Sequence, residues 1–143
     1  MPLQFDDLAI GTRHRLNLLV DERATVPALS HTLHGFSDMP PVFATAMMVG
    51  FIEWACVELL RPVLPDGHQT VGTHIDVSHV SATPIGMNVV AEVELVQIKS
   101  RTLRFKVRCT DEGGLIGEGT HERAIIERAK FLSRVLKKRS EHT

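Results

Sequence analysis

The sequence predicts an α+β domain in which a single antiparallel sheet wraps round one long buried helix. Two observations lead to this prediction. The stretch 42–60 is apolar almost all round, so a helix formed there should be buried rather than lie on a surface. After this stretch the hydrophobic period changes from 3.6 to 2, which indicates strands with one polar and one apolar face. The length of 143 residues predicts one domain, spanning 1–143.

The N-terminal part is expected to hold one strand and one long loop. The stretch 13–20 alternates, with His14, Leu16 and Leu18 on one face. Residues 21–41 look irregular and end in a Met-Pro-Pro turn, which disfavours a helix just before it. A loop of about twenty residues is long for a compact domain, and such loops often have a function, for example as a lid.

The remaining elements follow from the change of period. The helix is expected to end at Arg61-Pro62, with a turn at 65–67 after it. Four strands then follow, separated by turns that include Gly113-Gly114, and a short basic helix closes the chain. The expected strands are 71–80, 87–100, 101–110 and 115–126, and the expected C-terminal helix is 129–138.

The predicted order is therefore strand, long loop, buried helix and four strands in a meander. A sheet whose apolar face encloses one helix satisfies this pattern, and this arrangement is the hot-dog fold. Such a sheet leaves strand edges open, and open edges usually pair or pack across a two-fold axis. We therefore expect a homodimer.

Composition excludes several classes of function. The formal net charge of −1 provides no global attraction for nucleic acid or an anionic membrane, and no apolar window is long enough to span a bilayer. The N-terminus, Met1–Asp7, is acidic and lacks the regions of a signal peptide, so we expect a cytoplasmic protein. Cys56 and Cys109 lie in apolar patterns without CxxC spacing and are expected to be reduced core thiols.

No sequence motif indicates a metal or a bound cofactor. The eight histidines show no HxxxH or HExxH spacing, and the chain has no GxGxxG, no GxxxxGK[ST] and no GxSxG. We therefore expect neither a metal site nor a resident cofactor. A basic strand face could attract coenzyme A phosphates, although a solvated sheet face is the simpler interpretation. It consists of Arg101, Arg104, Lys106 and Arg108.

Glu53 is the first candidate catalytic residue. Its neighbours on the helix, three and four positions away, are apolar or glycine, namely Val49, Gly50, Cys56 and Val57. A carboxylate held in such surroundings needs a partner or a proton, because an isolated buried charge is too costly. It is either a group that performs chemistry or a structural carboxylate satisfied by backbone amides or an arginine.

His79 is the second candidate. On the strand expected at 71–80 it shares an apolar face with Thr73, Ile75 and Val77, and this face should meet the helix. One interpretation is a hydrogen-bonded core histidine. The other is an acid–base pair with Glu53, in which each group neutralises the other.

Thr45 is the third candidate, eight residues before Glu53. In one continuous helix this spacing is a rise of about 12 Å, too far for both side chains to reach one small reacting centre. Thr45 must then either precede the regular helix or act in the partner subunit's site. A plain threonine at a helix start is the alternative, and the free amides there could also bind an oxyanion.

Three stretches of the chain resemble the fluoroacetyl-coenzyme A thioesterases, a small hot-dog family. They are Val42–Cys56 with its Glu-Trp-Ala-Cys string, 72–84 with Gly72-Thr73, His79 and Ala82-Thr-Pro84, and Gly119–Ala124 with its Gly-Thr-His-Glu-Arg-Ala string. The resemblance runs from about residue 11 to residue 137. It implies that Thr45, Glu53 and His79 are catalytic.

The resemblance also implies a substrate pocket. Gly72 and Arg123 match positions that line the acyl pocket of the family. The family closes this pocket with a gate of two phenylalanines, of which one matches Phe36, whereas the other position is Met39 here. A flexible thioether in place of a ring changes the shape and polarity of the lid, which affects selectivity for fluoroacetyl groups rather than thioester cleavage.

The expected reaction is hydrolysis of a short-chain acyl-coenzyme A thioester at a subunit interface, without a metal. Helix-start amides or Gly72 would stabilise the oxyanion, and His79 would act as general base or protonate the thiolate. Glu53 would orient His79 or attack directly to give an anhydride, and Thr45 would bind the substrate or Glu53. An enoyl-thioester hydratase or dehydratase and a non-catalytic acyl-coenzyme A binding module remain the alternatives.

Overall fold

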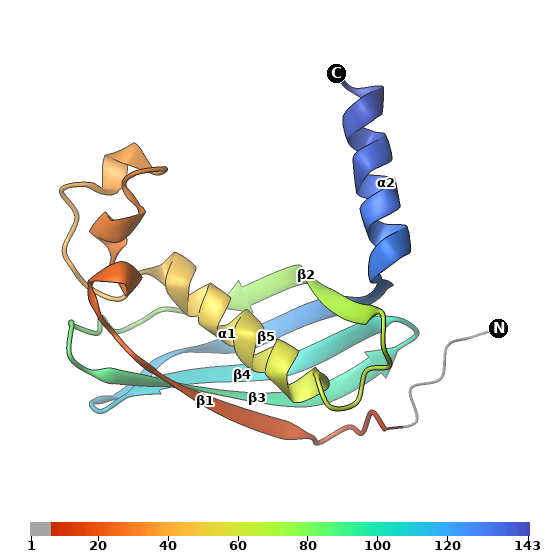
Figure 1. Cartoon of the computed structure of the whole chain (residues 1–143). Coiled ribbons are helices and arrows are strands. Elements are labelled where there is room, and N and C mark those ends of the chain that lie inside the picture. Colours follow the sequence, from red (N-terminus) through yellow and green to blue (C-terminus); the bar gives the residue numbers. More distant parts are fainter. Residues whose placement is uncertain (1–6) are drawn as a thin grey trace.

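The computed structural model describes residues 7–143 and shows an α+β arrangement of two helices and one sheet within this range (Figure 1). The acidic N-terminal segment Met1–Asp7 lies almost wholly outside the described residues, so the cytoplasmic location stays a prediction. Neither helix in the described part of the chain is long and apolar enough to cross a membrane. The elements are β1 Arg13–Leu19, α1 Thr45–Leu60, β2 His68–Val77, β3 Asn88–Lys99, β4 Thr102–Asp111, β5 Gly114–Glu127 and α2 Arg128–Glu141.

The five strands form one antiparallel sheet in the order β1-β3-β4-β5-β2. The expected strands are therefore confirmed, but the expected meander of four strands is wrong. Only β3, β4 and β5 follow one another; β2 pairs with β5 at the far edge, and β1 pairs with β3. Alternating polarity shows that a segment is a strand with one apolar face, but it does not encode which strand lies beside it.

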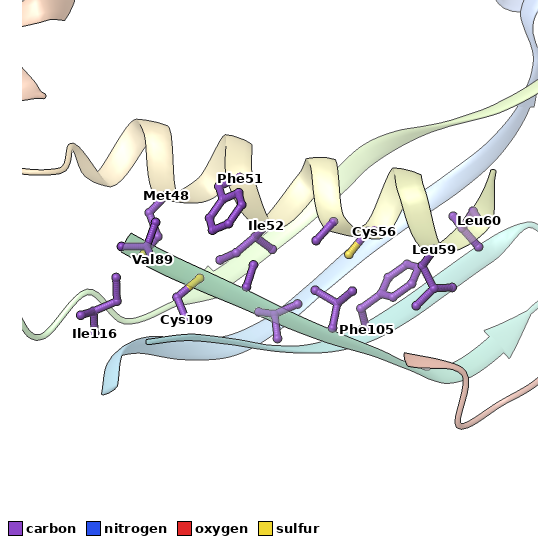
Figure 2. Packing of buried hydrophobic residues seen from close by; sticks show 14 of the residues in the cluster. Met48, Phe51, Ile52, Cys56, Leu59, Leu60, Val89, Phe105, Cys109 and Ile116 are labelled. Atoms are coloured by element: carbon purple, nitrogen blue, oxygen red, sulfur yellow. The ribbon is translucent and has the colours of Figure 1, made fainter. Parts of the chain in front are cut away.

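Helix α1 lies against the concave face of the sheet, and the core fills the space between them (Figure 2). The alternation predicted for β4 is confirmed, because Leu103, Phe105, Val107 and Cys109 are buried whereas the residues between them are exposed. Cys56 of α1 lies in the same core, and both cysteines are free. Burial raises the pKa of both thiols to about 12, so they remain protonated and unreactive.

The outer face of the sheet carries charges of alternating sign from strand to strand. Arg15 of β1 lies opposite Glu92 of β3, which lies opposite Arg108 of β4, which lies opposite Glu118 of β5. Next to this row, Arg13 forms an ion pair of 3.2 Å with Glu94. The basic residues of β4 are thus compensated by neighbouring carboxylates, which favours a solvated face over a phosphate-binding one.

Two element boundaries differ from the prediction and affect the site. Helix α1 begins at Thr45 rather than 42, because Val42 and Phe43 are extended and form bridges with Pro84 and Thr25. Strand β2 covers 68–77 rather than 71–80, so His79 lies beyond its end. Between β1 and α1 the long loop is confirmed. Its regular parts are three short 3₁₀ turns at Glu22–Ala24, Val26–Leu29 and His34–Phe36.

Helix α1 is not buried all round, contrary to the prediction. The sheet covers one side of it, while Ala46, Gly50 and Trp54, spaced four apart, are exposed in the single chain. The physical reason is that one curved sheet has a single concave face and cannot enclose a helix completely. An apolar exposed stripe on the central helix is a feature typical of a protein–protein contact.

Candidate active site

Thr45 and His79 form a direct pair at the start of α1. Thr45 is the first residue of the helix, and its Oγ1 lies 2.7 Å from Nδ1 of His79, two residues past the end of β2. The other ring nitrogen of His79, Nε2, is buried and has no hydrogen-bond partner within the described chain. Burial lowers the pKa of His79, so the ring is neutral at neutral pH.

A neutral His79 has two possible tautomers, and in each of them one ring nitrogen remains available for contact with a substrate or water. If Nδ1 carries the proton, it donates to Thr45, whose own hydroxyl hydrogen is free, and Nε2 is a proton acceptor. If Nε2 carries the proton, Thr45 donates to Nδ1, which is the geometry of a hydroxyl activated by a base. In both cases the unpartnered nitrogen is the group that a ligand or water would meet.

Glu53 belongs to a second cluster, two helical turns further along α1. Its Oε1 lies 2.9 Å from Nη1 of Arg123, an almost wholly buried residue on β5. Thr70 of β2 anchors the same guanidinium, accepting from Nε through its hydroxyl at 2.8 Å and from Nη2 through its carbonyl at 2.9 Å. The Glu53 side chain itself is 40% exposed.

The expected Glu53–His79 pair is therefore not formed within the chain. Glu53 pairs with Arg123, which is the structural alternative considered for a carboxylate on an apolar helix. His79 pairs with Thr45 instead. Since α1 is regular from Thr45 onward, the rise of about 12 Å between its residues 45 and 53 separates the two clusters.

His121 is a residue of this cluster that the sequence analysis did not single out. It lies on β5 and is 2% exposed, with Nδ1 2.7 Å from the carbonyl oxygen of His74 and Nε2 3.1 Å from Nη1 of Arg123. Its Nε2 is 4.0 Å from Glu53 Oε1. The alternation of β5 was the available signal, because His121, Arg123 and Ile125 share the inward face.

Gly72 provides the space for the Glu53 carboxylate. A Cβ at this position would collide with Oε1 of Glu53 and would lie 3.2 Å from Cε1 of His121. The register of β2 shifts between Gly72 and His74, so Thr73 forms a bulge and the simple alternation expected for this strand is broken. Gly72 thus lies against the carboxylate, as a residue lining a pocket would.

Phe36 is the last residue of the third 3₁₀ segment, and Met39 lies three residues later, in the turn that follows. The backbone N–H of Met39 donates to the carbonyl of Phe36 at 3.2 Å, and Met39 is 45% exposed. A hollow of about 490 Å³ lies elsewhere, on the charged outer face of the sheet. Lys106 and Arg108 line it, but none of the candidate catalytic or acyl-pocket residues does. The single chain thus brings the candidate residues together as two clusters and a separate turn that carries Phe36 and Met39.

The chain matches a known protein family over most of its length. Residues 20–129 match the family described as fluoroacetyl-CoA-specific thioesterase. The chain belongs to this thioesterase family. All candidate residues fall inside the matched range, and the resemblance expected from the sequence is confirmed.

Known members of the thioesterase family are similar to the chain over nearly its whole length. The fluoroacetyl-CoA thioesterase of Streptantibioticus cattleyicolor is 40% identical over 133 residues, which cover 93% of this chain and 96% of the relative. A solved structure of the fluoroacetyl-CoA thioesterase FlK has 40% identity and a TM-score of 0.90, covering 93% of this chain and 98% of that chain. A variant of FlK solved in complex with acetyl-CoA has 39% identity and a TM-score of 0.88, covering 92% and 98%. The hot-dog fold predicted from the sequence is thereby confirmed.

Proposed function

We propose that this protein hydrolyses short-chain acyl-coenzyme A thioesters, with Thr45, Glu53 and His79 as its catalytic residues. The observation that carries the proposal is the 2.7 Å Thr45–His79 pair with an unpartnered Nε2, in a chain that belongs to the thioesterase family. A thioester is electrophilic at its carbonyl carbon, and hydrolysis needs a base for water and stabilisation of an oxyanion. The pair and the N-terminus of α1 offer both.

The active form in this proposal is a homodimer whose site combines both clusters. The exposed stripe of α1 and the open edge of β2 support an antiparallel contact between two copies. If two copies of α1 cross near residue 49, Thr45 of one copy lies level with Glu53 of the other. Gly50 next to the crossing point would let the two helices approach closely, since a Cβ there meets no atom within 4 Å.

In the reaction, His79 Nε2 removes a proton from water as the water oxygen attacks the carbonyl carbon. The Thr45 hydroxyl and the free amides at the start of α1 donate to the developing oxyanion. The carbon–sulfur bond then breaks, and His79 returns the proton to the departing thiolate. The partner's Glu53, held by Arg123, orients the water in one version of the mechanism.

In the other version the Glu53 carboxylate attacks the carbonyl carbon and forms an anhydride, which water then opens. A single turnover in ¹⁸O-labelled water tests for the anhydride. Label incorporated into Glu53 demonstrates an anhydride that water opens at the glutamyl carbon, whereas label confined to the released acid is the result of direct attack by water or of an anhydride opened at the acyl carbon.

The acyl pocket in this proposal is lined by Gly72 and Arg123 and covered by Phe36 and Met39. The family is described as fluoroacetyl-CoA-specific, and the relative from Streptantibioticus cattleyicolor is a fluoroacetyl-CoA thioesterase. Met39 gives a more flexible cover than an aromatic ring, so we propose weaker discrimination between fluoroacetyl and acetyl groups. Met39→Phe should raise the fluoroacetyl-to-acetyl ratio of kcat/KM, and an unchanged ratio would remove Met39 from the specificity determinants.

Measurement of free thiol release tests the function directly. The substrates are acetyl-, fluoroacetyl-, propionyl-, butyryl- and long-chain acyl-coenzyme A. Turnover should be highest for the short chains, and His79→Ala and Thr45→Ala should each lower kcat/KM by on the order of 10²- to 10⁴-fold. Absence of thiol release from every substrate would end the proposal. In a separate assay with an enoyl-coenzyme A, loss of enoyl absorbance without thiol release would favour a hydratase.

A further inference from the structure

We infer that His121 is a positioning residue that fixes the Arg123–Glu53 pair through the Nδ1–H tautomer of its neutral ring. This inference rests on the proposed function, since the pair it holds is part of the proposed site. His121 touches neither the Thr45–His79 pair nor a lid residue in any contact of the described chain. Its two ring nitrogens instead link β2 to the guanidinium of Arg123.

Both contacts of the imidazole determine the same tautomer. The carbonyl oxygen of His74 can only accept, so Nδ1, at 2.7 Å, must carry the hydrogen. The guanidinium of Arg123 can only donate, so Nε2, at 3.1 Å, must present its lone pair. A neutral Nδ1–H ring satisfies both neighbours, whereas the other tautomer and the cation satisfy only one or neither.

The lone pair of His121 is one of the acceptors that hold the Arg123 guanidinium in place. Nε and Nη2 are held by Thr70, and the two hydrogens of Nη1 are shared between His121 Nε2 and Glu53 Oε1. Without an acceptor at Nε2, one Nη1 hydrogen would be buried and unsatisfied, and the guanidinium would gain by rotating. Because Glu53 is partly exposed, Arg123 is the contact that determines where its carboxylate points.

The surroundings of His121 oppose its protonation. Burial lowers the pKa of His121, and the neighbouring Arg123 lowers it further, although the His74 carbonyl and Glu53 act in the opposite direction. The titratable groups that face it are Glu53 from α1, His74 from β2 and Arg123 from its own strand, while Phe105 lies opposite on β4. A proton on Nε2 would face a guanidinium at 3.1 Å and would draw the Glu53 carboxylate away from Arg123.

His121 therefore does not act as the general base, because its lone pair is already occupied. This separates it from His79, whose Nε2 has no partner. A fixed Arg123 matters for catalysis because a misplacement of about 1 Å in a reacting group lowers the rate on the order of 10²-fold.

Two substitutions, each of which preserves a different contact of the imidazole, test the role of His121. His121→Gln can place an oxygen near the position of Nε2 and so keep an acceptor for Arg123. His121→Asn reaches only to the position of Nδ1, so it keeps a donor for His74 and loses the acceptor. We expect His121→Asn to lower kcat by roughly 10- to 100-fold with little change in KM, and His121→Gln to stay within about threefold of wild type.

Nitrogen-15 NMR supplies a readout that does not depend on turnover. In wild type at pH 7, His121 should show the neutral Nδ1–H tautomer, and Arg123 should show separate Nη1 and Nη2 resonances because rotation of its guanidinium is restricted. The Arg123 resonances should merge in His121→Asn and stay separate in His121→Gln. If wild type hydrolyses no thioester, the proposed function fails, but these spectra still decide the role of His121.

An Nε2–H or doubly protonated His121 in wild type would overturn the inference. It is also overturned if both variants keep full activity, or if both lose activity in proportion to a lower melting temperature, which is the result of a purely structural role. Should His121→Asn not fold, the tautomer of the wild-type ring decides alone.

Discussion

The charged guanidinium of Arg123 is buried, whereas the carboxylate of its partner Glu53 is partly exposed to solvent. Substitutions of the two residues should therefore differ in their effect on the free energy of unfolding. Removing the guanidinium leaves Thr70 and His121 without their donor, whereas changing Glu53 alters one partly solvated contact. We expect Arg123→Met to lower the free energy of unfolding by roughly 1–3 kcal/mol. Glu53→Gln should cost less than about 1 kcal/mol, because the exposed half of the carboxylate is screened by water.

Urea denaturation at one fixed protein concentration measures both values, since dimer formation would make stability depend on concentration. A larger loss for Glu53→Gln than for Arg123→Met would show that the carboxylate, not the guanidinium, is the buried member of the pair.

The buried histidines should make the protein less stable in mild acid. Burial lowers the pKa of both His79 and His121 from the ordinary value of 6.5. As the pH falls below 6.5, these histidines become protonated in the unfolded chain but stay neutral in the folded chain. The free energy of unfolding therefore falls until the pH reaches the lowered pKa of the histidines in the folded chain. Above about pH 7.5 these two residues should contribute no pH dependence.

Denaturation between about pH 5.5 and 8 measures this slope, and His121→Gln should make it shallower. His31→Gln, which replaces an exposed histidine, is the matched control with which the slope of His121→Gln is compared. Stability that stays constant or rises on acidification would contradict the lowered pKa of His79 and His121 in the folded chain.

Gly72→Ala should damage the site without damaging the fold. The new methyl group collides with the Glu53 carboxylate, which can move because it is partly exposed, so the chain should still fold. We expect kcat/KM to fall on the order of 10- to 100-fold, measured by thiol release. Gly113→Ala is the control at an exposed hairpin, where the group nearest to the added methyl is the Asp111 carboxylate. Full activity of Gly72→Ala would show that the position of Glu53 is unimportant for turnover.

At the scale of elements, the sequence predicts whether each segment is a helix or a strand. It predicts less well which strands lie side by side in the sheet. The alternation of β4 identified its inward residues correctly, because period and burial are both local properties of a strand. The pairing of β2 with β5 depends on the path of the chain after α1 and has no local signal. For the same reason Arg123 and Thr70, which are distant in sequence, could not be paired by pattern alone.

The boundaries of α1 and β2 explain why the sequence predicts the polar residues of the candidate site but not their partners. Glu53, His79 and Thr45 could be selected as polar residues in apolar segments, but their partners depend on where α1 and β2 end. Because α1 begins at Thr45, the threonine belongs to the helix and meets His79 rather than Glu53. The bulge at Thr73 further shifts the face of β2, and single-residue bulges leave no periodic trace.

The exposed face of α1 gives a prediction for this element. Gly50→Gln adds a side chain where the single chain has open space, and it removes a glycine from the helix, which favours the helix by up to about 1 kcal/mol. If two copies meet on this face, the same change should weaken their association. Analytical ultracentrifugation should then show more monomer for Gly50→Gln than for wild type, with a folded monomer by circular dichroism. Gly113→Gln is the control, and an unchanged dimer in Gly50→Gln would exclude this face from the interface.

At the scale of the whole molecule, the proposed homodimer would bring the two clusters together in one site. One chain offers a threonine–histidine pair with a free nitrogen at the start of α1, and a carboxylate held by a buried arginine two turns later. A symmetric dimer would form two identical sites, each with Thr45 and His79 from one copy and Glu53 with Arg123 from the other. The central claim is that catalysis needs both copies.

Mixing two inactive variants tests this claim most directly. Thr45→Ala and Glu53→Ala should each hydrolyse acetyl-coenzyme A at a small fraction of the wild-type rate. After the two are mixed and allowed to exchange subunits, half of the dimers should be mixed and each should contain one intact site, so activity should recover to about a quarter of wild type. No recovery, although labelled subunits demonstrably exchange, would show that Thr45 and Glu53 act from the same chain and would contradict the composite site.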